Sequence, residues 1–360
     1  MSNRIGVVTG GGDCPGLNAV IRAIAKASAK RGWECIGILG GYEGLLEPQR
    51  TIPLDYQALS GLLTRGGTIL GTASRGKFSA KVGHGESRAL PKEVLEGVKS
   101  GMEALGLFAL VSIGGDGSMS IAQQLFEFGI PIVGVPKTID NDLEGTLFTF
   151  GFDSAVACAT DALDRLHTTA ESHNRVMILE VMGRYAGWIA LFAGVAGGAD
   201  VILIPEIPFS YESVCTKIQE RENLGKKFTM VIVAEGAREK DSRFVTSGAH
   251  AKTGEARLGG IGAIVSAEIE KRSGKESRVC VLGHLQRGGS PTTFDRALCS
   301  IFGATAVELV AAGEFGKMVA FTGPQIGAIK IRDAVGRLKT VRPDGNLVRT
   351  ARALGICFGD

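Results

Sequence analysis

The sequence predicts an α/β fold with mostly parallel sheets, and three observations lead to this prediction. Nine short stretches are continuously apolar, which is typical of strands that helices cover on both faces of a parallel sheet. Glycine-rich polar turns follow most of these stretches, and segments with helical periodicity lie between many of them. A length of 360 residues favours about two domains, and 44% hydrophobic residues suffice for packed cores.

The predicted strands occupy, in chain order, residues 4–10, 34–40, 108–115, 131–136, 175–183, 200–206, 228–236, 278–284 and 318–323. The predicted helices between them include residues 16–30, 152–170 and 294–312. In open α/β sheets, ligands bind at the carboxyl ends of the strands. Those ends carry GGGD, GGDG, PKTIDND, MGR, PEIP, AEG and GHLQRGG. We therefore expect the polar and glycine-rich segments to meet at one edge.

Composition excludes several classes of protein. The net charge is +3 and no run of Lys or Arg occurs, so nucleic acid is not an expected partner. Apolar runs are shorter than the roughly 20 residues of a membrane helix, so no membrane partner is expected. The seven cysteines are scattered without CxxC spacing, which is typical of reduced thiols. The N-terminal MSNRIGVVTGGGD shows no signal peptide, and the sequence predicts a cytoplasmic protein.

Two glycine-rich loops are candidates for phosphate binding. GGGDCPGLN (10–18) follows the first predicted strand and opens a helix, where backbone N–H groups can approach an anion. It matches neither GxGxxG nor GxxxxGK[ST]. In IGGDGS (113–118), Asp116 lies among glycines and Ser118 begins the next helix. A carboxylate beside phosphate-binding amides suits Mg²⁺, usually through water. The structural alternative is an aspartate that caps the helix.

Charged residues follow other predicted strands. PKTIDND (136–142) places Lys137 beside two carboxylates, Asp140 and Asp142. SHNR, MGRYAGW and RVCVLGHLQRGG add arginines, which bind phosphate as planar forks. A single arginine is more often part of a surface ion pair, and a single histidine such as His284 is more often structural. Their collective position at strand ends predicts a site for a phosphorylated anion.

The motifs GGDCPGLNAVIRA, GGDGS, PKTIDND, EVMGRYAG, PEIPF and VLGHLQRGGSP resemble those of 6-phosphofructokinases of the bacterial type in order and spacing. The resemblance extends from Arg4 to about Lys330. It implies two Rossmann-like, doubly wound, mostly parallel sheet domains with the active site in the cleft between them. Residues 1–151 plus about 286–336 would bind the nucleotide, and residues 152–285 plus about 337–360 would bind the sugar phosphate.

The resemblance also implies an activity. This family of transferases carries out a committed step of glycolysis, in which a kinase moves the γ-phosphoryl group of Mg-ATP to the 1-hydroxyl of fructose 6-phosphate. The products are fructose 1,6-bisphosphate and ADP. Such a transfer depends mostly on positioning and charge neutralisation, with a carboxylate that accepts the hydroxyl proton.

Roles carry over to the matching positions. The nucleotide-binding residues implied are Gly12, Arg75, Gly76, Gly115, Asp116, Gly117 and Ser118, with Asp116 as the magnesium ligand. The catalytic residues implied are Asp140 as the base, Lys137, Thr138 and Arg184. The sugar-phosphate-binding residues implied are Thr138, Ile139, Asp140, Asp142, Arg175, Met182, Gly183, Arg184, Glu235, Arg278, His284, Leu285, Gln286 and Arg287.

Arg175 and Arg278 match positions that reach a neighbouring subunit, so the resemblance implies a homo-oligomer, a dimer or a tetramer, with shared sites. The sequence departs from the family in two places. GTASRGKF (71–78) carries its arginine, Arg75, one residue late. The family's basic effector site is only partly retained, because Lys26 and His167 replace arginines. Effector control is therefore not implied.

The phosphoryl donor leaves two alternatives. Members that use pyrophosphate typically carry aspartate at position 117 and lysine at 137, whereas members that use ATP carry glycine at 117. This chain combines Gly117 with Lys137. An aspartate at 117 would place negative charge where the α-phosphate of a nucleotide passes, so the glycine favours ATP. A pyrophosphate-dependent fructose-6-phosphate 1-phosphotransferase is the alternative.

Other classes fit less well. NAD kinases and diacylglycerol kinases share GGDG but lack TIDND and GHxQRGG. A Rossmann dehydrogenase would carry GxGxxG and an acidic residue about 20 positions later. A sugar-phosphate sensor without catalysis would be expected to lose Asp116 or Asp140, and both are present.

Overall fold

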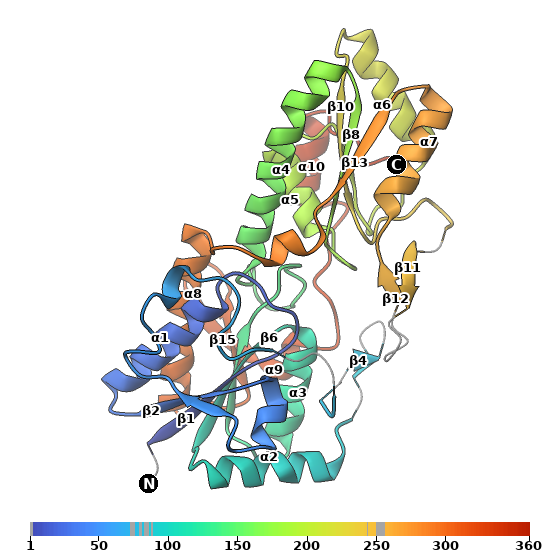
Figure 1. Ribbon diagram of the computed structural model, residues 1–360. Helices are drawn as coiled ribbons and strands as arrows, with labels where there is room; N and C mark the ends of the chain where they lie inside the picture. Colours follow the sequence, from blue (N-terminus) through green and yellow to red (C-terminus); the bar gives the residue numbers. More distant parts are fainter. Residues whose placement is uncertain are drawn as a thin grey trace. The chain divides into compact units, whose positions relative to one another are not determined.

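The computed structural model describes residues 3–72, 76–78, 81–82, 86–87, 89–242, 244–249 and 256–360. The chain divides into two compact units (Figure 1). The first unit comprises Met1–Ser154 and Arg287–Leu338, and the second comprises Ala155–Gln286 and Lys339–Asp360.

The first unit contains a seven-stranded sheet in the order β15-β14-β7-β6-β1-β2-β3. The five central strands are parallel: β1 (Arg4–Thr9), β2 (Glu34–Ile38), β6 (Ala109–Gly114), β7 (Ile132–Pro136) and β14 (Lys317–Phe321). The edge strands β3 (Thr51–Pro53) and β15 (Ile326–Lys330) are antiparallel to their neighbours. Thr9 pairs with Ile113 and Gly114 with Pro136, so β1, β6 and β7 end side by side.

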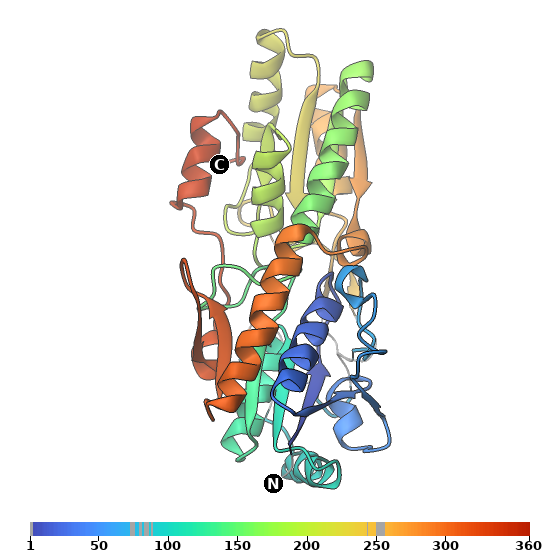
Figure 2. The same cartoon turned by 90° about the vertical axis from the view of Figure 1, so that its left-hand side faces the viewer.

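Helices cover both faces of this sheet. On one face, α1 (Leu17–Lys30) packs against α8 (Thr293–Ala311), as Figure 2 shows. A Cβ on Gly303 would lie 2.6 Å from the Cβ of Ala23, so glycine permits this close approach. On the other face, α2 (Lys92–Ala104), α3 (Asp116–Glu127) and α9 (Ile331–Ala334) bury their apolar residues in one core. The 3₁₀ helices η1 (Gly41–Leu45) and η2 (Leu62–Thr64) and the short pair β4 (Lys81–Val82) and β5 (Glu86–Ser87) complete the described part of this unit.

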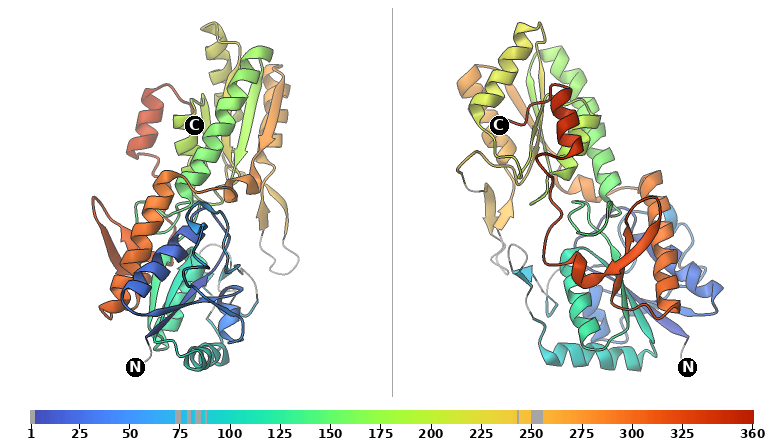
Figure 3. Two further views of the ribbon diagram at one scale, coloured as in Figure 1. Left: turned by 60° about the vertical axis from the view of Figure 1, so that its left-hand side comes forward. Right: turned by 180° about the vertical axis from the view of Figure 1, so that it is seen from behind.

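The second unit contains a parallel four-stranded sheet in the order β13-β8-β10-β9. Its strands are β8 (Val176–Val181), β9 (Val201–Leu203), β10 (Thr229–Ala234) and β13 (Ser277–Val281). The helices α6 (Tyr211–Asn223) and α7 (Ile261–Ser273) share a core with the sheet. The other helices are α4 (Phe152–His173), α5 (Trp188–Ala196) and α10 (Asn346–Ala353), as Figure 3 shows. The first three residues of α4 belong to the first unit.

Two smaller features belong to the second unit. The strands β11 (Thr246–Ala249) and β12 (Ala256–Leu258) form an antiparallel pair. The C-terminal tail lies along β9, because the N–H of Ile202 donates to the carbonyl of Cys357 at 2.9 Å. The N–H of Cys357 in turn donates to the carbonyl of Asp200 at 3.0 Å, so the tail protects an edge of the sheet.

The predicted α/β class with two mostly parallel sheets is confirmed. Each of the nine predicted strands corresponds to one strand of the two sheets, and the three predicted helices correspond to α1, α4 and α8. Strand β13 is less buried than its apolar sequence predicts, because it lies at the edge of its sheet. Within the described part of the chain, no helix has the length and apolar character needed to cross a membrane.

Candidate active site

The GGGD loop connects β1 to α1 in the first unit. The N–H of Gly10 donates to the carbonyl of Ile113 at 2.9 Å, which ties the loop to the neighbouring strand. A Cβ on Gly10 would lie 2.5 Å from the Oγ of Ser118, and a Cβ on Gly12 would lie 2.8 Å from Nη1 of Arg287. The loop therefore passes so close to other segments that only glycine fits without displacement.

Three side chains donate to consecutive carbonyl groups of this loop. The hydroxyl of Thr72 donates to the carbonyl of Gly11 at 2.5 Å, and the ammonium of Lys137 donates to that of Gly12 at 2.5 Å. Nη1 of Arg287 donates to the carbonyl of Asp13 at 3.1 Å. Lys137 is only 4% exposed, and burial lowers its pKa from the usual value of a lysine.

The GGDGS segment forms the beginning of α3. Asp116 is the first residue of the helix and is half-buried, and Gly115 precedes it. The N–H of Lys137 donates to the carbonyl of Gly114 at 2.9 Å, which joins this segment to the end of β7. The hydroxyl of Tyr42 donates to the carbonyl of Ser118 at 3.0 Å. The segment thus presents a helix N-terminus, which favours negative charge, next to the GGGD loop.

The TIDND segment is a loop held by hydrogen bonds of its own. The N–H of Asp140 donates to Oγ1 of Thr138 at 3.1 Å. Asn141 adopts a left-handed conformation with φ of 51° and is buried. Its side chain donates to the carbonyl of Leu147 at 3.2 Å and accepts from the N–H of Thr149 at 3.1 Å. The hydroxyl of Thr149 donates to the carbonyl of Thr138 at 2.7 Å. These bonds fix the backbone that carries Asp140 and Asp142.

The second unit has its own cluster at the ends of β8 and β10. Met182, Gly183 and Arg184 follow β8, and Glu235 follows β10. The N–H of Glu235 donates to the carbonyl of Val181 at 2.9 Å. A Cβ on Gly236 would lie 2.0 Å from the carbonyl oxygen of Arg184, so the two loops are in direct contact. The N–H of Met182 donates to Oε1 of the buried Gln286 at 2.8 Å.

Glu206 of the PEIP segment supports the loop that carries Arg184. Its carboxylate accepts from the N–H of Gly187 at 3.0 Å and from the N–H of Val341 at 2.8 Å. Burial raises the pKa of Glu206, and the hydrogen bonds from Val341 and Gly187 oppose that effect. The carboxylate therefore joins the start of α5 to the segment that leads to α10.

Arg175 and Arg278 lie on either side of one carboxylate. Nε of Arg175 is 2.8 Å from Glu276, and Arg278 also pairs with Glu276. Arg278 is exposed, as are His284 and Leu285 on the 3₁₀ helix η3 (Gly283–Arg287). The side chains of Arg175 and Arg278 are thus gathered at the edge strand β13 of the second unit.

The predicted residues of the first unit form a second group, apart from the second-unit residues described above. Most of them lie at the carboxyl ends of β1, β6 and β7, and Arg287 lies against the GGGD loop. The group comprises Gly12, Gly115, Asp116, Gly117, Ser118, Lys137, Thr138, Ile139, Asp140, Asp142 and Arg287. Gly76, with φ of 95°, lies beside Glu43, which accepts from the N–H of Lys77 at 2.7 Å. Arg75 lies outside the described residues.

Sequence reasoning missed several residues that shape these loops, namely Tyr42, Thr72, Asn141, Thr149 and Glu206. The tendency of asparagine to adopt the left-handed conformation in turns could have indicated Asn141. Tyr42, Thr72 and Glu206 act through contacts that are distant in sequence. Thr149 bonds to Asn141 and Thr138, which lie 8 and 11 residues before it. No group of three or more His, Cys, Asp or Glu side chains suited to a metal occurs in the described ranges.

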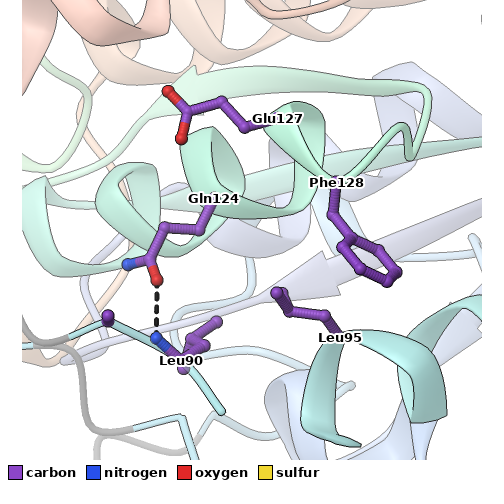
Figure 4. Close-up of a pocket in the computed structure, with 6 residues that line it drawn as sticks. Leu90, Leu95, Gln124, Glu127 and Phe128 are labelled. Carbon is purple, nitrogen blue, oxygen red and sulfur yellow. Dashed lines mark hydrogen bonds between the residues drawn. The ribbon is translucent and has the colours of Figure 1, made fainter. Parts of the chain in front are cut away.

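A separate hollow of about 430 Å³ lies in the first unit near the C-terminal end of α3 (Figure 4). Leu95, Gln124, Glu127 and Phe128 line it, and the N–H of Leu90 donates to Oε1 of Gln124 at 2.7 Å. None of the predicted site residues lines it. It lies at the opposite end of α3 from Asp116, about 16 Å along the helix.

The chain is similar to known proteins over nearly its whole length. A family model described as phosphofructokinase matches residues 4–310. The chain is 54% identical over 357 residues to an ATP-dependent 6-phosphofructokinase of Chloroflexus aurantiacus, covering 99% of this chain and 98% of the relative. It is 49% identical over 343 residues to a pyrophosphate–fructose 6-phosphate 1-phosphotransferase of Streptomyces coelicolor, covering 94% and 96%.

Solved structures are also similar. The T-state crystal structure of Pichia pastoris phosphofructokinase matches with a TM-score of 0.80 and 30% identity, over 93% of this chain and 35% of that chain. A pyrophosphate-dependent phosphofructokinase of Nitrosospira multiformis matches with a TM-score of 0.82 over 100% of this chain and 93% of that chain. At 21% identity, the second likeness concerns the fold alone.

Proposed function

Because the chain belongs to the phosphofructokinase family, we propose that it is an ATP-dependent 6-phosphofructokinase. It transfers the γ-phosphoryl group of ATP to the 1-hydroxyl of fructose 6-phosphate. The observation that carries the proposal is that a carboxylate-bearing loop, TIDND, and two glycine-rich loops end three adjacent parallel strands of the first unit. This arrangement supports the proposal of a general base beside groups suited to hold phosphates.

We propose that the first unit binds the nucleotide. Its phosphates would lie against the GGGD loop and the start of α3, with contacts to Gly12 and to the loop from Gly115 to Ser118. Arg75 and Gly76 would contribute to the same site. A helix N-terminus and glycine amides favour this anion.

Asp116 fits the role of magnesium ligand. It is a half-buried carboxylate at the N-terminus of α3, and no cluster of three ligands surrounds a metal position among the described residues. Magnesium commonly takes one or two carboxylates and completes its shell with substrate phosphates and water. When bound, the ion supplies neutralisation of phosphate charge.

Asp140 is the proposed base. Its carboxylate would accept the proton of the sugar hydroxyl as the oxygen attacks the γ-phosphorus, and the bond from that phosphorus to the leaving oxygen of ADP breaks. Thr138, Ile139 and Asp142 support it in the same loop. The ammonium of Lys137 lies at the carbonyl of Gly12, where a positive charge can neutralise nearby phosphate.

The resemblance implies a set of residues that would bind the sugar phosphate. In the second unit these are Met182, Gly183, Arg184 and Glu235, with His284, Leu285 and Gln286 on η3. Arg287 would contribute from the first unit. Arg175 and Arg278 would serve the site of a neighbouring subunit in a homo-oligomer, a dimer or a tetramer.

The donor is tested by a coupled assay with fructose 6-phosphate, magnesium and either ATP or pyrophosphate. The 54% identity to an ATP-dependent relative and the glycine at 117 favour ATP, while the 49% identity to a pyrophosphate-dependent relative makes the second arm necessary. We expect turnover with ATP at least tenfold above that with pyrophosphate. Equal or faster turnover with pyrophosphate would overturn the choice of donor, and no turnover with either donor would overturn the proposed function.

A further inference from the structure

The carbonyl groups of Gly11, Gly12 and Asp13 accept hydrogen bonds from Thr72, Lys137 and Arg287 respectively. We propose that these three side chains, named here the carbonyl triad, are positioning residues that orient the GGGD backbone toward the nucleotide phosphates. The inference rests on the proposed function. It assigns a role to Thr72 and gives Lys137 and Arg287 a second role besides direct contact with phosphate.

The geometry of the peptide group links each held carbonyl to the direction of the next N–H. The described residues include no cis peptide bond, and in a trans peptide the carbonyl of one residue and the N–H of the next point in opposite directions. A carbonyl of Gly11 held by Thr72 therefore turns the N–H of Gly12 away from Thr72. In the same way, Lys137 turns the N–H of Asp13 away, and Arg287 turns that of Cys14 away.

Among the residues that the structure describes, these N–H groups have no hydrogen-bond acceptor. The N–H of Gly10 is used by the carbonyl of Ile113, but those of Gly12, Asp13 and Cys14 donate to no acceptor within the described ranges. Successive N–H groups that are left available in a glycine-rich turn form a concave site for an anion. The carbonyl triad thus binds the negative ends of the same peptide groups whose positive ends are offered to phosphate.

Two of the three donors, Thr72 and Lys137, are themselves held in place. Thr72 follows a loop that Thr9 and Asn18 fix, since the hydroxyl of Thr9 donates to the carbonyl of Gly71 at 2.6 Å and Asn18 accepts from the N–H of Ile69 at 2.8 Å. Lys137 extends from the end of β7 and is buried. Two of the three donors are charged, and charge-assisted bonds are stronger than neutral ones. The orientation of the loop is therefore set before a ligand binds.

The test measures binding of Mg-ATP by calorimetric titration, which does not depend on turnover. Thr72→Val removes the hydroxyl at constant shape and should weaken Mg-ATP binding by about 5- to 20-fold, the effect of one lost hydrogen bond. Thr72→Ser keeps the donor and should bind Mg-ATP within about twofold of the wild type. The KM for fructose 6-phosphate should stay unchanged in both variants, a selectivity that a general loss of structure would not produce.

Thr160→Val is the matched control. Thr160 is also half-buried and donates its hydroxyl to a carbonyl, that of Val156 at 2.9 Å, but it lies in α4 of the second unit. It should not change Mg-ATP affinity. Lys137→Met should also weaken Mg-ATP binding. In the double variant with Thr72→Val, the fold increase in the Kd for Mg-ATP should be less than the product of the two single increases, because both side chains act on one loop.

The outcomes distinguish the positioning role of the carbonyl triad from the proposed enzymatic function. Wild-type Mg-ATP affinity in Thr72→Val, or equal losses in Thr72→Val and Thr72→Ser, would overturn the positioning role. A wild-type protein that binds Mg-ATP but does not phosphorylate fructose 6-phosphate would overturn the proposed function alone. A wild-type protein that does not bind Mg-ATP would overturn both.

Discussion

The carboxylate of Asp140 is presented by a loop whose conformation is fixed from within. Asn141 takes the strained left-handed conformation that allows the chain to turn between the two aspartates, and its side chain is bonded to Leu147 and Thr149. Preorganisation of this kind matters for catalysis, because a small displacement of a general base costs much of its effect.

Replacement of Asp140 by asparagine should lower kcat by about 10²- to 10⁴-fold, the contribution of a general base, with little change in substrate binding. Steady-state kinetics with ATP and fructose 6-phosphate measure the effect. Asp344→Asn is the control, because Asp344 is an exposed carboxylate that pairs with Arg342 in the second unit. Near-complete turnover in Asp140→Asn would contradict the assignment of the base.

Gly117→Asp tests the donor at the scale of one residue. Position 117 is the second residue of α3, beside the proposed phosphate site. An added carboxylate should repel and crowd the nucleotide, and we expect the KM for ATP to rise about tenfold or more while that for fructose 6-phosphate changes little. Gly323→Asp is a control, because nothing lies within 4 Å of a Cβ at that position. Unchanged ATP kinetics in Gly117→Asp would contradict the inference that Gly117 favours ATP as the phosphoryl donor.

At the scale of elements, the starts of α4 and α8 are joined by a buried carboxylate. Oδ2 of Asp295 accepts from the hydroxyl of Ser154 at 2.6 Å and from its N–H at 2.9 Å. The hydroxyl of Thr292, the residue before α8, accepts from the N–H of Asp295 at 3.3 Å. Burial raises the pKa of Asp295 to about 6, and the hydrogen bonds from Ser154 oppose that effect.

This raised pKa predicts a pH dependence of stability. Between about pH 4 and 6 the folded protein binds a proton at Asp295 that the unfolded chain has lost, so this residue's contribution to stability falls as the pH rises through that window. Thermal unfolding at several pH values should show that the wild type loses about 2–3 kcal/mol relative to Asp295→Asn between pH 4 and 6.

In the control residue, the contribution to stability depends on pH with the opposite sign. Asp161, whose pKa is lowered by its hydrogen bond to Arg165, should lose its favourable contribution as the pH falls, and Asp161→Asn should remove only that small effect. If the difference in stability between the wild type and Asp295→Asn did not vary with pH, the buried carboxylate would not have the raised pKa described here.

At the scale of the whole molecule, the proposed homo-oligomer would combine residues from two copies of the chain in one site. In one subunit, Glu276 pairs with both Arg175 and Arg278 at the edge of the second unit's sheet. The side-chain hydrogen bond from Arg175 lowers the pKa of Glu276, so its carboxylate stays charged and keeps both arginines gathered. In the proposed oligomer, a sugar phosphate bound to a neighbouring subunit would compete with Glu276 for the two guanidinium groups.

Arg175→Ala and Arg278→Ala should each raise the KM for fructose 6-phosphate, by about tenfold, because each removes a charge-assisted contact. Hybrid oligomers of Arg278→Ala and Asp140→Asn subunits should recover activity, since some sites would combine two intact halves. Activity of separated parental oligomers and of mixed, verified hybrids is compared in the same assay. Hybrids that stay as inactive as the parents would argue against shared sites.

Nine strands, three helices and the types of residue at their ends could be predicted from the amino-acid sequence alone. Continuous apolar runs marked the strands because both faces of most of them are buried, and glycine marked loops such as GGGD, where any side chain would collide with Ser118 or Arg287. The order and spacing of PKTIDND and GHLQRGG indicated the family, because catalytic residues of one loop are adjacent in sequence.

The contacts that hold these loops could not be predicted from the sequence and follow from the tertiary structure. Thr72, Lys137 and Arg287 reach the GGGD carbonyl groups from positions 61, 125 and 274 residues further along the chain. Glu206 likewise connects Gly187 to Val341. Sequence patterns carry the local preferences of a residue and the face that it buries. Which distant side chain meets which carbonyl depends on strand order and loop path, and these are fixed by the packing of the whole unit.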